Sequence, residues 1–369
     1  MRWSEELARI KGREAGYQRG HSDGYKLGFR DAVMRKTPDD EQSLWDIRVL
    51  YVTAGIGVPY PALDQAIIEA LGQLVKHLKV AGPTEDVVAI AAEMSSDLVL
   101  VLNGVVLPAE KVDSLRNHGY KTAVWFTDDP YYTDWTITIA KRYDYVFTLE
   151  LACVSFYREA GCQQVYYLPF ATNSAVFQPM QVNASYQSDI CLIGTAFWNR
   201  IELIDRLTPI LLNRKVIISG WWWDRLNNFS KLSNSIKLGH WMTPEETACY
   251  YNGAKIIINL HRSIHDDSIN VNTSKKIPPL SVNPRTFEIA SCGAFQLSDF
   301  RPETDQLYSI GTEIVTFTSH NELKHKIDYY LRNEEERQSI ALNGLARTRR
   351  DHTYHKRLST MLSILFPLS

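Results

Sequence analysis

Short apolar runs rich in β-branched residues alternate with helix-length amphipathic stretches from residue 47 almost to the end of the chain. Because each step between parallel strands needs a long crossover, this alternation restricts the chain to an α/β architecture. The amphipathic stretch from Pro61 to Leu78 predicts the first crossover helix. The first set of strands is predicted at IRVLYVT (47–53), DLVLVLNG (97–104), KTAVWFTDD (121–129), YDYVFTLE (143–150) and QVYYLPF (164–170).

A second set of strands follows a polar, turn-rich stretch at residues 171–188, where we place a domain boundary. We therefore expect two doubly wound, Rossmann-like domains facing a crevice, with ligands at the strand ends that line it. The predicted segments are an N-terminal helix (1–40), two domains (41–180 and 181–350) and a final helix (351–369) that packs back on the first domain. The second strands are predicted at DICLIGT (189–195), KVIISG (215–220), SIKLGH (235–240), KIIINLH (255–261), GAFQLS (293–298) and EIVTF (313–317).

The first forty residues carry a glycine at every fourth position, from Gly12 to Gly28, bracketed in the same register by Ala8 and Ala32. This spacing places the small residues on one slowly rotating stripe of a helix, where another backbone can approach closely. Each glycine costs roughly 1 kcal/mol of helix propensity relative to alanine, so a partner must offset that cost. Residues 8–32 therefore predict a self-association or docking helix; a flexible tail is the alternative. Residues 37–40 read as a linker.

The overall composition excludes several classes of protein. Forty Lys and Arg against 42 Asp and Glu give a formal charge of −2, without the basic excess of a nucleic-acid-binding protein. Five cysteines, an odd number without C-x-x-C spacing, are typical of buried thiols in a reducing compartment. Uncharged apolar runs fall well short of the ~20 residues that span a bilayer. We expect a soluble cytoplasmic protein with no integral membrane segment and no nucleic-acid partner.

The run NPRTFEIASCGAFQLSDF (283–300) combines a helix start with charged residues. Asn283 can cap this helix, whose first turn, including Thr286, offers backbone N–H groups to a pyrophosphate beside the cation Arg285. Glu288 lies one turn on, where its carboxylate could accept hydrogen bonds from ribose hydroxyls. An ordinary capped helix with an i, i+3 ion pair between Arg285 and Glu288 explains the same pattern equally well.

Other strand ends in the second half supply candidate donor contacts. Gly194 and Gly220 each follow a strand, and Arg200 begins the next helix, where it could pair with phosphate. Three tryptophans at 221–223 could stack on a base or a sugar, or belong to the core. His261 and Arg262 would reach the crevice from the next strand end. The nearby His265, Asp266 and Asp267 lack the spacing of a metal site.

Asp128 and Asp129 end a strand of the first half and are candidates for a general base on an acceptor hydroxyl. Alternatively, they only start and cap a turn at Pro130. The chain has no nucleophile elbow, Walker loop or dinucleotide fingerprint, which disfavours hydrolase, NTPase and dehydrogenase functions.

The motifs W-x-x-D-D-P, Y-D-Y-V-F-T, D-I-x-x-I-G-T-x-x-x-x-R, I-N-L-H-R and N-x-R-T-F-E-I-x-x-C-G-A-F, in this order, resemble the CgeB-type spore-maturation glycosyltransferases. The likeness covers roughly residues 46–350, and its most specific part is Asn283–Phe295. The glycine repeat separately resembles the helix of type III secretion and flagellar export stator proteins.

The resemblance implies a GT-B fold in which the second domain holds a nucleotide-sugar donor and the first receives the acceptor. It implies a metal-independent reaction, with no permanently bound cofactor and no metal ligands. Arg200, Arg262 and Arg285 would be the cations, and His261 would lie near the donor sugar. Glu288 matches the ribose-binding second Glu of an E-x7-E motif.

In the first domain, the resemblance implies that the transferring end of the donor approaches Gly55 and Gly57. It also implies that Asp128 or Asp129 is the base. The first Glu of the E-x7-E motif would fall at Leu280, so the usual stereochemical marker is missing.

The function expected from these residues is transfer of a sugar from a nucleoside diphosphate, of UDP or TDP type, to a protein or glycan acceptor of the cell or spore surface. Two alternatives stay open. One is a sugar-nucleotide epimerase or hydrolase on the same fold. The other is a catalytically weak scaffold that binds a glycan or nucleotide and is recruited through the N-terminal helix, which could also form a homodimer.

Overall fold

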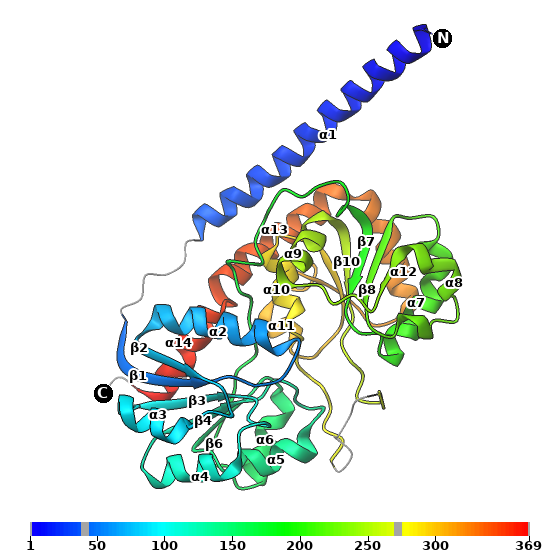
Figure 1. Ribbon diagram of the computed structural model, residues 1–369. Coiled ribbons are helices and arrows are strands. Elements are labelled where there is room, and N and C mark those ends of the chain that lie inside the picture. The colour runs from blue at the N-terminus through cyan, green and yellow to red at the C-terminus, as the bar shows by residue number, and fades with distance from the viewer. Residues whose placement is uncertain (1, 38–43, 269–274, 368–369) are drawn as a thin grey trace.

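The computed structural model describes residues 2–37, 44–268 and 275–367, and contains two α/β domains that face each other (Figure 1). Each domain is built on a six-stranded sheet in which every pair of neighbouring strands is parallel, with helices on both faces. This architecture confirms the predicted fold class of two doubly wound domains.

The first sheet has the strand order β2-β1-β3-β4-β5-β6. Its strands are β1 (Trp45–Val52), β2 (Val75–Ala81), β3 (Leu98–Leu102), β4 (Thr122–Trp125), β5 (Tyr145–Thr148) and β6 (Gln164–Tyr167). Its helices are α2 (Tyr60–Leu74), α3 (Val87–Met94), α4 (Ala109–Asn117), α5 (Thr133–Ala140) and α6 (Leu151–Glu159).

One prediction for this domain is wrong: the helix expected as far as Leu78 ends at Leu74, and β2 begins with the next residue. The helix and the strand follow each other without a turn residue, so nothing in the local sequence marks the change. Exposed Lys76 and His77 lie on an edge strand with one neighbour, β1, where polar residues are common.

The second sheet has the order β12-β11-β10-β7-β8-β9. Its strands are β7 (Ser188–Ile193), β8 (Val216–Gly220), β9 (Ile236–Leu238), β10 (Ala254–Asn259), β11 (Gln296–Asp299) and β12 (Val315–Phe317). Its helices are α7 (Trp198–Leu211), α8 (Phe229–Leu232), α9 (Pro244–Gly253), α10 (Arg285–Ser291), α11 (Thr304–Leu307) and α12 (His320–Arg332), with short 3-10 turns at Trp223–Arg225 and Ser233–Ser235.

Two late segments join the domains. Helix α13 (Glu334–Asp351) ends near α14 (Tyr354–Leu365), and buried Tyr354, Leu358 and Leu362 of α14 belong to the core between α2 and the first sheet. Figure 1 shows α14 lying beside α2. The segment before α10 also crosses over, because Ile277 is buried in the core of the first domain. Both segments thus connect the second domain to the core of the first.

The glycine repeat lies within a single helix, α1 (Arg2–Lys36), which projects from the second domain (Figure 1). Its last turns are docked, because Lys26 pairs with Glu334 of α13 at 2.5 Å and Arg30 donates to Asn252 Oδ1 at 3.3 Å. A cavity of about 590 Å³ lies between these turns and the second domain. A Cβ added at any glycine from 12 to 28 would meet nothing within 4 Å, so the stripe faces open space. Linker residues 38–40 lie outside the described residues.

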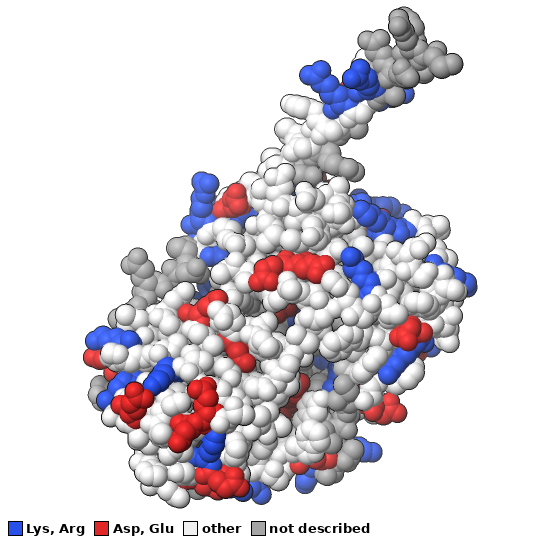
Figure 2. Space-filling model, in the orientation of Figure 1, with Lys and Arg blue, Asp and Glu red and all other residues white. Residues whose placement is uncertain are grey.

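Among the described helices, none is long and apolar enough to cross a membrane. All five cysteines are free. Basic and acidic side chains are interspersed over the visible face of the two domains (Figure 2).

Candidate functional site

Two glycines at the carboxyl ends of β7 and β8 shape the floor of the site in the second domain. Gly194 has φ +139° and Gly220 has φ +138°, conformations that side-chain-bearing residues rarely adopt. A Cβ on Gly220 would collide with the backbone of Gly194, and a Cβ on Gly194 would collide with the guanidinium groups of Arg285 and Arg200. The glycines therefore let two strand ends and two arginines meet.

Four arginines gather at this edge of the sheet. Arg200 is 3% exposed and donates to the carbonyls of Leu260 (2.8 Å) and Thr195 (2.7 Å), and Arg285 donates to Ile193 O at 3.1 Å. Arg262 and Arg301 lie nearby, because the charges of both lower the pKa of Tyr131, and the charge of Arg262 also lowers that of Arg200. Burial and the charge of Arg285 hold the pKa of the Arg200 guanidinium well below its ordinary value. The arginine cluster, Arg200, Arg262, Arg285 and Arg301, is thus rich in positive charge.

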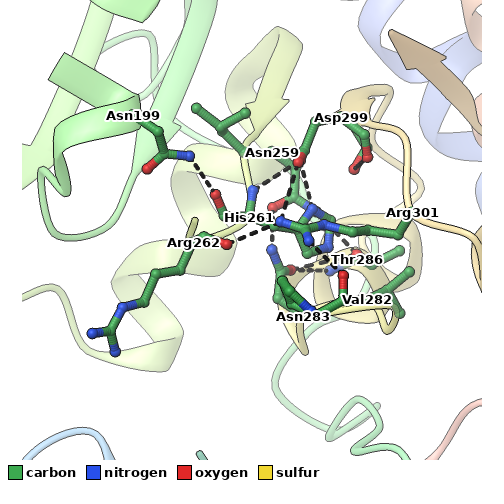
Figure 3. A network of polar contacts seen from close by, with 12 residues as sticks. Asn199, Asn259, His261, Arg262, Val282, Asn283, Thr286, Asp299 and Arg301 are labelled. Carbon is green, nitrogen blue, oxygen red and sulfur yellow. Dashed lines mark hydrogen bonds and ion pairs between the residues drawn. The ribbon is translucent and has the colours of Figure 1, made fainter. Parts of the chain in front are cut away.

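One carboxylate lies inside the arginine cluster. Asp299, at the end of β11, accepts hydrogen bonds on Oδ1 from the backbone N (2.8 Å) and ring Nδ1 (2.5 Å) of His261, and its Oδ2 lies 3.5 Å from Arg301 Nη2 (Figure 3). Burial alone would raise the pKa of Asp299, but His261 and Arg301 lower it. Burial lowers the pKa of His261, which is 3% exposed.

The start of α10 is held by a network of amide side chains (Figure 3). Asn283 Oδ1 accepts from the backbone N of Thr286 at 3.2 Å, as expected of a cap, and Asn283 Nδ2 donates to Asn259 Oδ1 at 2.9 Å. Asn259 Nδ2 donates in turn to the hydroxyl of Thr286, which is fully buried. The Thr286 hydroxyl thus helps to hold the start of α10 against β10.

Glu288 faces the same region from the next turn of α10. Its side chain keeps some accessible surface, but the carboxyl lies deep enough that burial raises its pKa to about 7, against the opposing effect of Arg285. Among the described residues, none donates a hydrogen bond to this carboxylate. It is therefore available to hydroxyl donors on a ligand.

In the first domain, Asp128 follows β4 and is surrounded by hydrogen-bond donors. Its Oδ2 accepts from Thr127 Oγ1 (2.5 Å), Tyr60 Oη (2.7 Å) and Asn103 Nδ2 (3.3 Å), side chains that come from the ends of β4, the start of α2 and the end of β3. The other oxygen, Oδ1, has no such contact with the described residues.

Asp129 points the opposite way, into the first domain. It is 2% exposed and accepts hydrogen bonds from Tyr157 Oη (2.8 Å) and Thr148 Oγ1 (2.7 Å). Burial raises the pKa of this carboxyl to about 7. The two neighbouring aspartates thus lie in different environments, and Asp128 is the one at the surface of the strand ends.

The remaining candidates are spread more widely. Gly55 (φ +67°) packs its backbone against Pro83 after β1, and Gly57 lies on the exposed loop that follows. Two of the three tryptophans differ in exposure. Trp223 is fully buried and donates to Gly194 O at 3.0 Å, whereas Trp221 is 37% exposed and packs on Trp241.

The loop after β10 holds no metal site among its described residues. Asp266 accepts from the backbone N of Trp198 at 2.7 Å, which ties the loop to α7. Within residues 2–37, 44–268 and 275–367, no three His, Cys, Asp or Glu side chains are grouped so that they could hold a metal ion.

The two domains touch across the crevice through Arg262. Its guanidinium lies 4.4 Å from the ring centre of Tyr131 in the first domain and 4.6 Å from that of Phe197 in the second, and Tyr131 Oη donates to Arg262 O at 2.8 Å. Stacking of this kind holds the guanidinium plane while leaving its edge for an anion. Tyr131, Asp299 and Arg301 were not among the residues that the sequence analysis selected.

Comparison with known proteins agrees with this arrangement. Residues 200–363 match a family model described as glycosyl transferase-like. Spore protein CgeB of Bacillus subtilis is 30% identical over 324 residues, which cover 88% of this chain and all of that protein.

Solved structures share the fold at much lower sequence identity. Sucrose-phosphate synthase of Thermosynechococcus elongatus is 12% identical, with a TM-score of 0.60 over 85% of this chain and 97% of its own. HepE of Anabaena in complex with UDP-glucose is 11% identical, with a TM-score of 0.59 over 86% and 99%. A putative UDP-N-acetylglucosamine 2-epimerase of Listeria monocytogenes is 10% identical, with a TM-score of 0.56 over 88% and 98%. With its two wound domains and 30% identity to CgeB along nearly its whole length, the chain belongs to the CgeB-like family of GT-B glycosyltransferases.

Proposed function

We propose that this glycosyltransferase uses a nucleoside-diphosphate sugar of UDP or TDP type and transfers the sugar to a protein or glycan acceptor of the cell or spore surface. The main support for a nucleoside-diphosphate donor is the arginine cluster. Four guanidinium groups gather at the strand ends of the second domain, where Asp299 and Glu288 are the carboxylates beside them. HepE, which shares the fold, was solved with UDP-glucose.

The charge imbalance favours a diphosphate physically. Arg200 is buried without a carboxylate partner among the described residues, and its repulsion by Arg285 is relieved when an anion enters. Guanidinium groups bind phosphate through paired, charge-assisted hydrogen bonds, each worth about 1.5–3 kcal/mol. Four such groups can stabilise the charge that grows on the leaving diphosphate, so we propose that transfer needs no metal ion and no permanently bound cofactor.

Glu288 completes the proposed donor site. A carboxylate that lacks a protein partner, placed beside Arg285, can accept hydrogen bonds from ribose hydroxyls while the diphosphate lies on the arginines. Exposed Trp221 can offer a ring face to the base, whereas Trp223 is buried.

Asp128 is the proposed general base. Tyr60, Asn103 and Thr127 hold Oδ2, which leaves Oδ1 to take the proton of the acceptor hydroxyl. As that proton moves to Asp128, the acceptor oxygen bonds to the anomeric carbon, and the bond from this carbon to the diphosphate oxygen breaks. The negative diphosphate is released onto the arginines. Asp129, buried among hydroxyl groups, would hold this strand end in place.

Helix α1 is proposed as the docking element. Its glycines face open space along the projecting part, and exposed Tyr17 and Tyr25 flank them, so a second copy of the helix or a partner helix could pack there. The five free cysteines favour a reducing compartment, and we propose the cytoplasm, where nucleotide sugars are made.

The experiment that tests the donor site is a thermal-shift series with UDP, TDP, GDP and CMP and their sugars, with and without EDTA. A ligand that binds only the folded protein raises the unfolding midpoint. We expect UDP or TDP and the corresponding sugars to stabilise the wild type, with or without EDTA. Arg285→Ala and Glu288→Ala should lose most of this effect.

Arg206→Ala is the matched control, because Arg206 lies on the surface of α7 and pairs with Glu202 away from the cluster. This variant should respond to nucleotides as the wild type does. If no nucleotide shifts the wild-type midpoint at millimolar concentration, the chain is a scaffold. If the bound sugar nucleotide is hydrolysed or epimerised but never transferred, the epimerase or hydrolase alternative holds.

A further inference from the structure

Several buried polar atoms without a hydrogen-bond partner lie beside the arginine cluster. Within the described residues, these atoms include His261 Nε2, Arg262 Nε and Nη2, Arg301 Nε and Asn199 Oδ1. Leaving a buried polar atom unpaired costs about 1–3 kcal/mol, so native proteins rarely leave several together. A ligand that satisfies these atoms removes the penalty.

The orientation of the His261 ring follows from its partner. Asp299 Oδ1 accepts from both the backbone N and the ring Nδ1 of His261, and a carboxylate can only accept at these positions. Nδ1 therefore carries the ring proton, and Nε2 is left with a lone pair. Burial lowers the pKa of His261 against the opposing effect of Asp299, which favours the neutral ring.

An unprotonated Nε2 differs chemically from its surroundings. The guanidinium groups of Arg200, Arg262, Arg285 and Arg301 are hydrogen-bond donors, which suit the oxygens of a diphosphate. Nε2 can only accept, and a phosphate ionised at neutral pH offers no proton. The group that meets Nε2 must be a donor, and the hydroxyls on the transferred sugar are the donors nearest to the diphosphate in a nucleotide sugar.

We propose that His261 accepts a hydrogen bond through Nε2 from a hydroxyl of the donor's sugar, so that it helps to select the sugar. Asp299 is the positioning residue that fixes the ring. This inference rests on the proposed function and deepens it, because it assigns separate roles within one donor site. The arginines bind the diphosphate, and His261 binds a hydroxyl of the sugar. Figure 3 shows Asp299 and Arg301 on one side of His261 and the chain leading to Arg262 on the other.

The test is to measure dissociation constants for UDP and for UDP-glucose, UDP-galactose and UDP-N-acetylglucosamine by calorimetry. The quantity of interest is the ratio of the affinity for the sugar nucleotide to that for UDP. For the preferred sugar, His261→Phe should lower this ratio about tenfold, the effect of one lost hydrogen bond of about 1.4 kcal/mol, while affinity for UDP changes less than about twofold. His261→Gln should recover part of the ratio, because its amide oxygen can accept.

His325→Phe is the matched control, since His325 lies exposed on α12. Its ratio should equal that of the wild type. An unchanged ratio in His261→Phe overturns the inference, and so does a wild-type ratio no greater than one for all three sugar nucleotides. If UDP itself fails to bind, the uridine part of the proposed function is contradicted instead.

A second measurement keeps the inference testable without any nucleotide. In the ligand-free protein labelled with 15N-histidine, the His261 Nε2 resonance should have the shift of an unprotonated ring nitrogen, and Asp299→Asn should change it and lower the affinity ratio. A protonated Nε2 in the wild type would overturn the inference whatever the nucleotide results are, because it could not accept.

Discussion

Replacing Gly194 by alanine should strain the backbone and displace two arginines of the donor site. The backbone of Gly194 has φ +139°, so a side-chain-bearing residue there costs about 1–3 kcal/mol in strain alone. The new Cβ would also collide with the guanidinium groups of Arg285 and Arg200. Loss of the hydrogen bond from Arg285 to Ile193 O adds about 1.5–3 kcal/mol, so we expect Gly194→Ala to lower the free energy of unfolding by about 3–5 kcal/mol.

The control variant Gly239→Ala measures the cost of backbone strain alone, without any displacement of the arginines. Gly239 follows β9 with φ +68°, and a Cβ there would meet nothing within 4 Å, so we expect a loss of about 1–2 kcal/mol. Urea unfolding followed by circular dichroism measures both losses. In calorimetry, Gly194→Ala should weaken nucleotide binding at least about tenfold, and Gly239→Ala should leave it unchanged. Equal nucleotide affinity in Gly194→Ala and the wild type would refute the placement of the two arginines in the donor site.

Three further predictions concern other parts of the molecule. Asp128→Asn should lower kcat for sugar transfer about 100-fold or more with little change in donor affinity, whereas Asp129→Asn should mainly lower the unfolding midpoint; an equal effect on kcat would argue against Asp128 as the base. Burial raises the pKa of Glu303 to about 8, so its protonated form is favoured in the folded state, and its contribution to stability should fall as the pH rises from about 4.5 to about 8. Glu303→Gln should flatten this fall in pH-dependent urea unfolding, and an unchanged slope would contradict it. Gly20→Leu should abolish self-association through α1 in analytical ultracentrifugation, and a wild type that is monomeric at high micromolar concentration would rule out the homodimer.

The sequence was sufficient for the architecture because strand and helix patterns are local. The exception, β2, follows α2 without a break, and its exposed Lys76 and His77 carry none of the apolar signal of a central strand. At the candidate site, Arg200, Arg262, Arg285 and His261 could be selected because each lies at the end of a predicted strand or at a helix start. The same rule, applied to the strand at GAFQLSDF, would have selected Asp299.

Other features depend on tertiary contacts that no spacing reveals. Asp128 and Asp129 are adjacent in the sequence but face opposite sides of the strand end, and only their partners show which one is open to the crevice. Tyr131 stacks on Arg262 from the other domain. Thr286 lies at a helix start, yet its hydroxyl is turned inward to Asn259. Each of these depends on how the two domains and the loops between them pack.

A crystal structure of the complex with UDP would locate the donor site directly. We expect the diphosphate in contact with Arg200, Arg262 and Arg285, with the ribose hydroxyls on Glu288. A nucleotide bound elsewhere, such as in the cavity between α1 and the second domain, with the arginine cluster unchanged, would contradict this expectation.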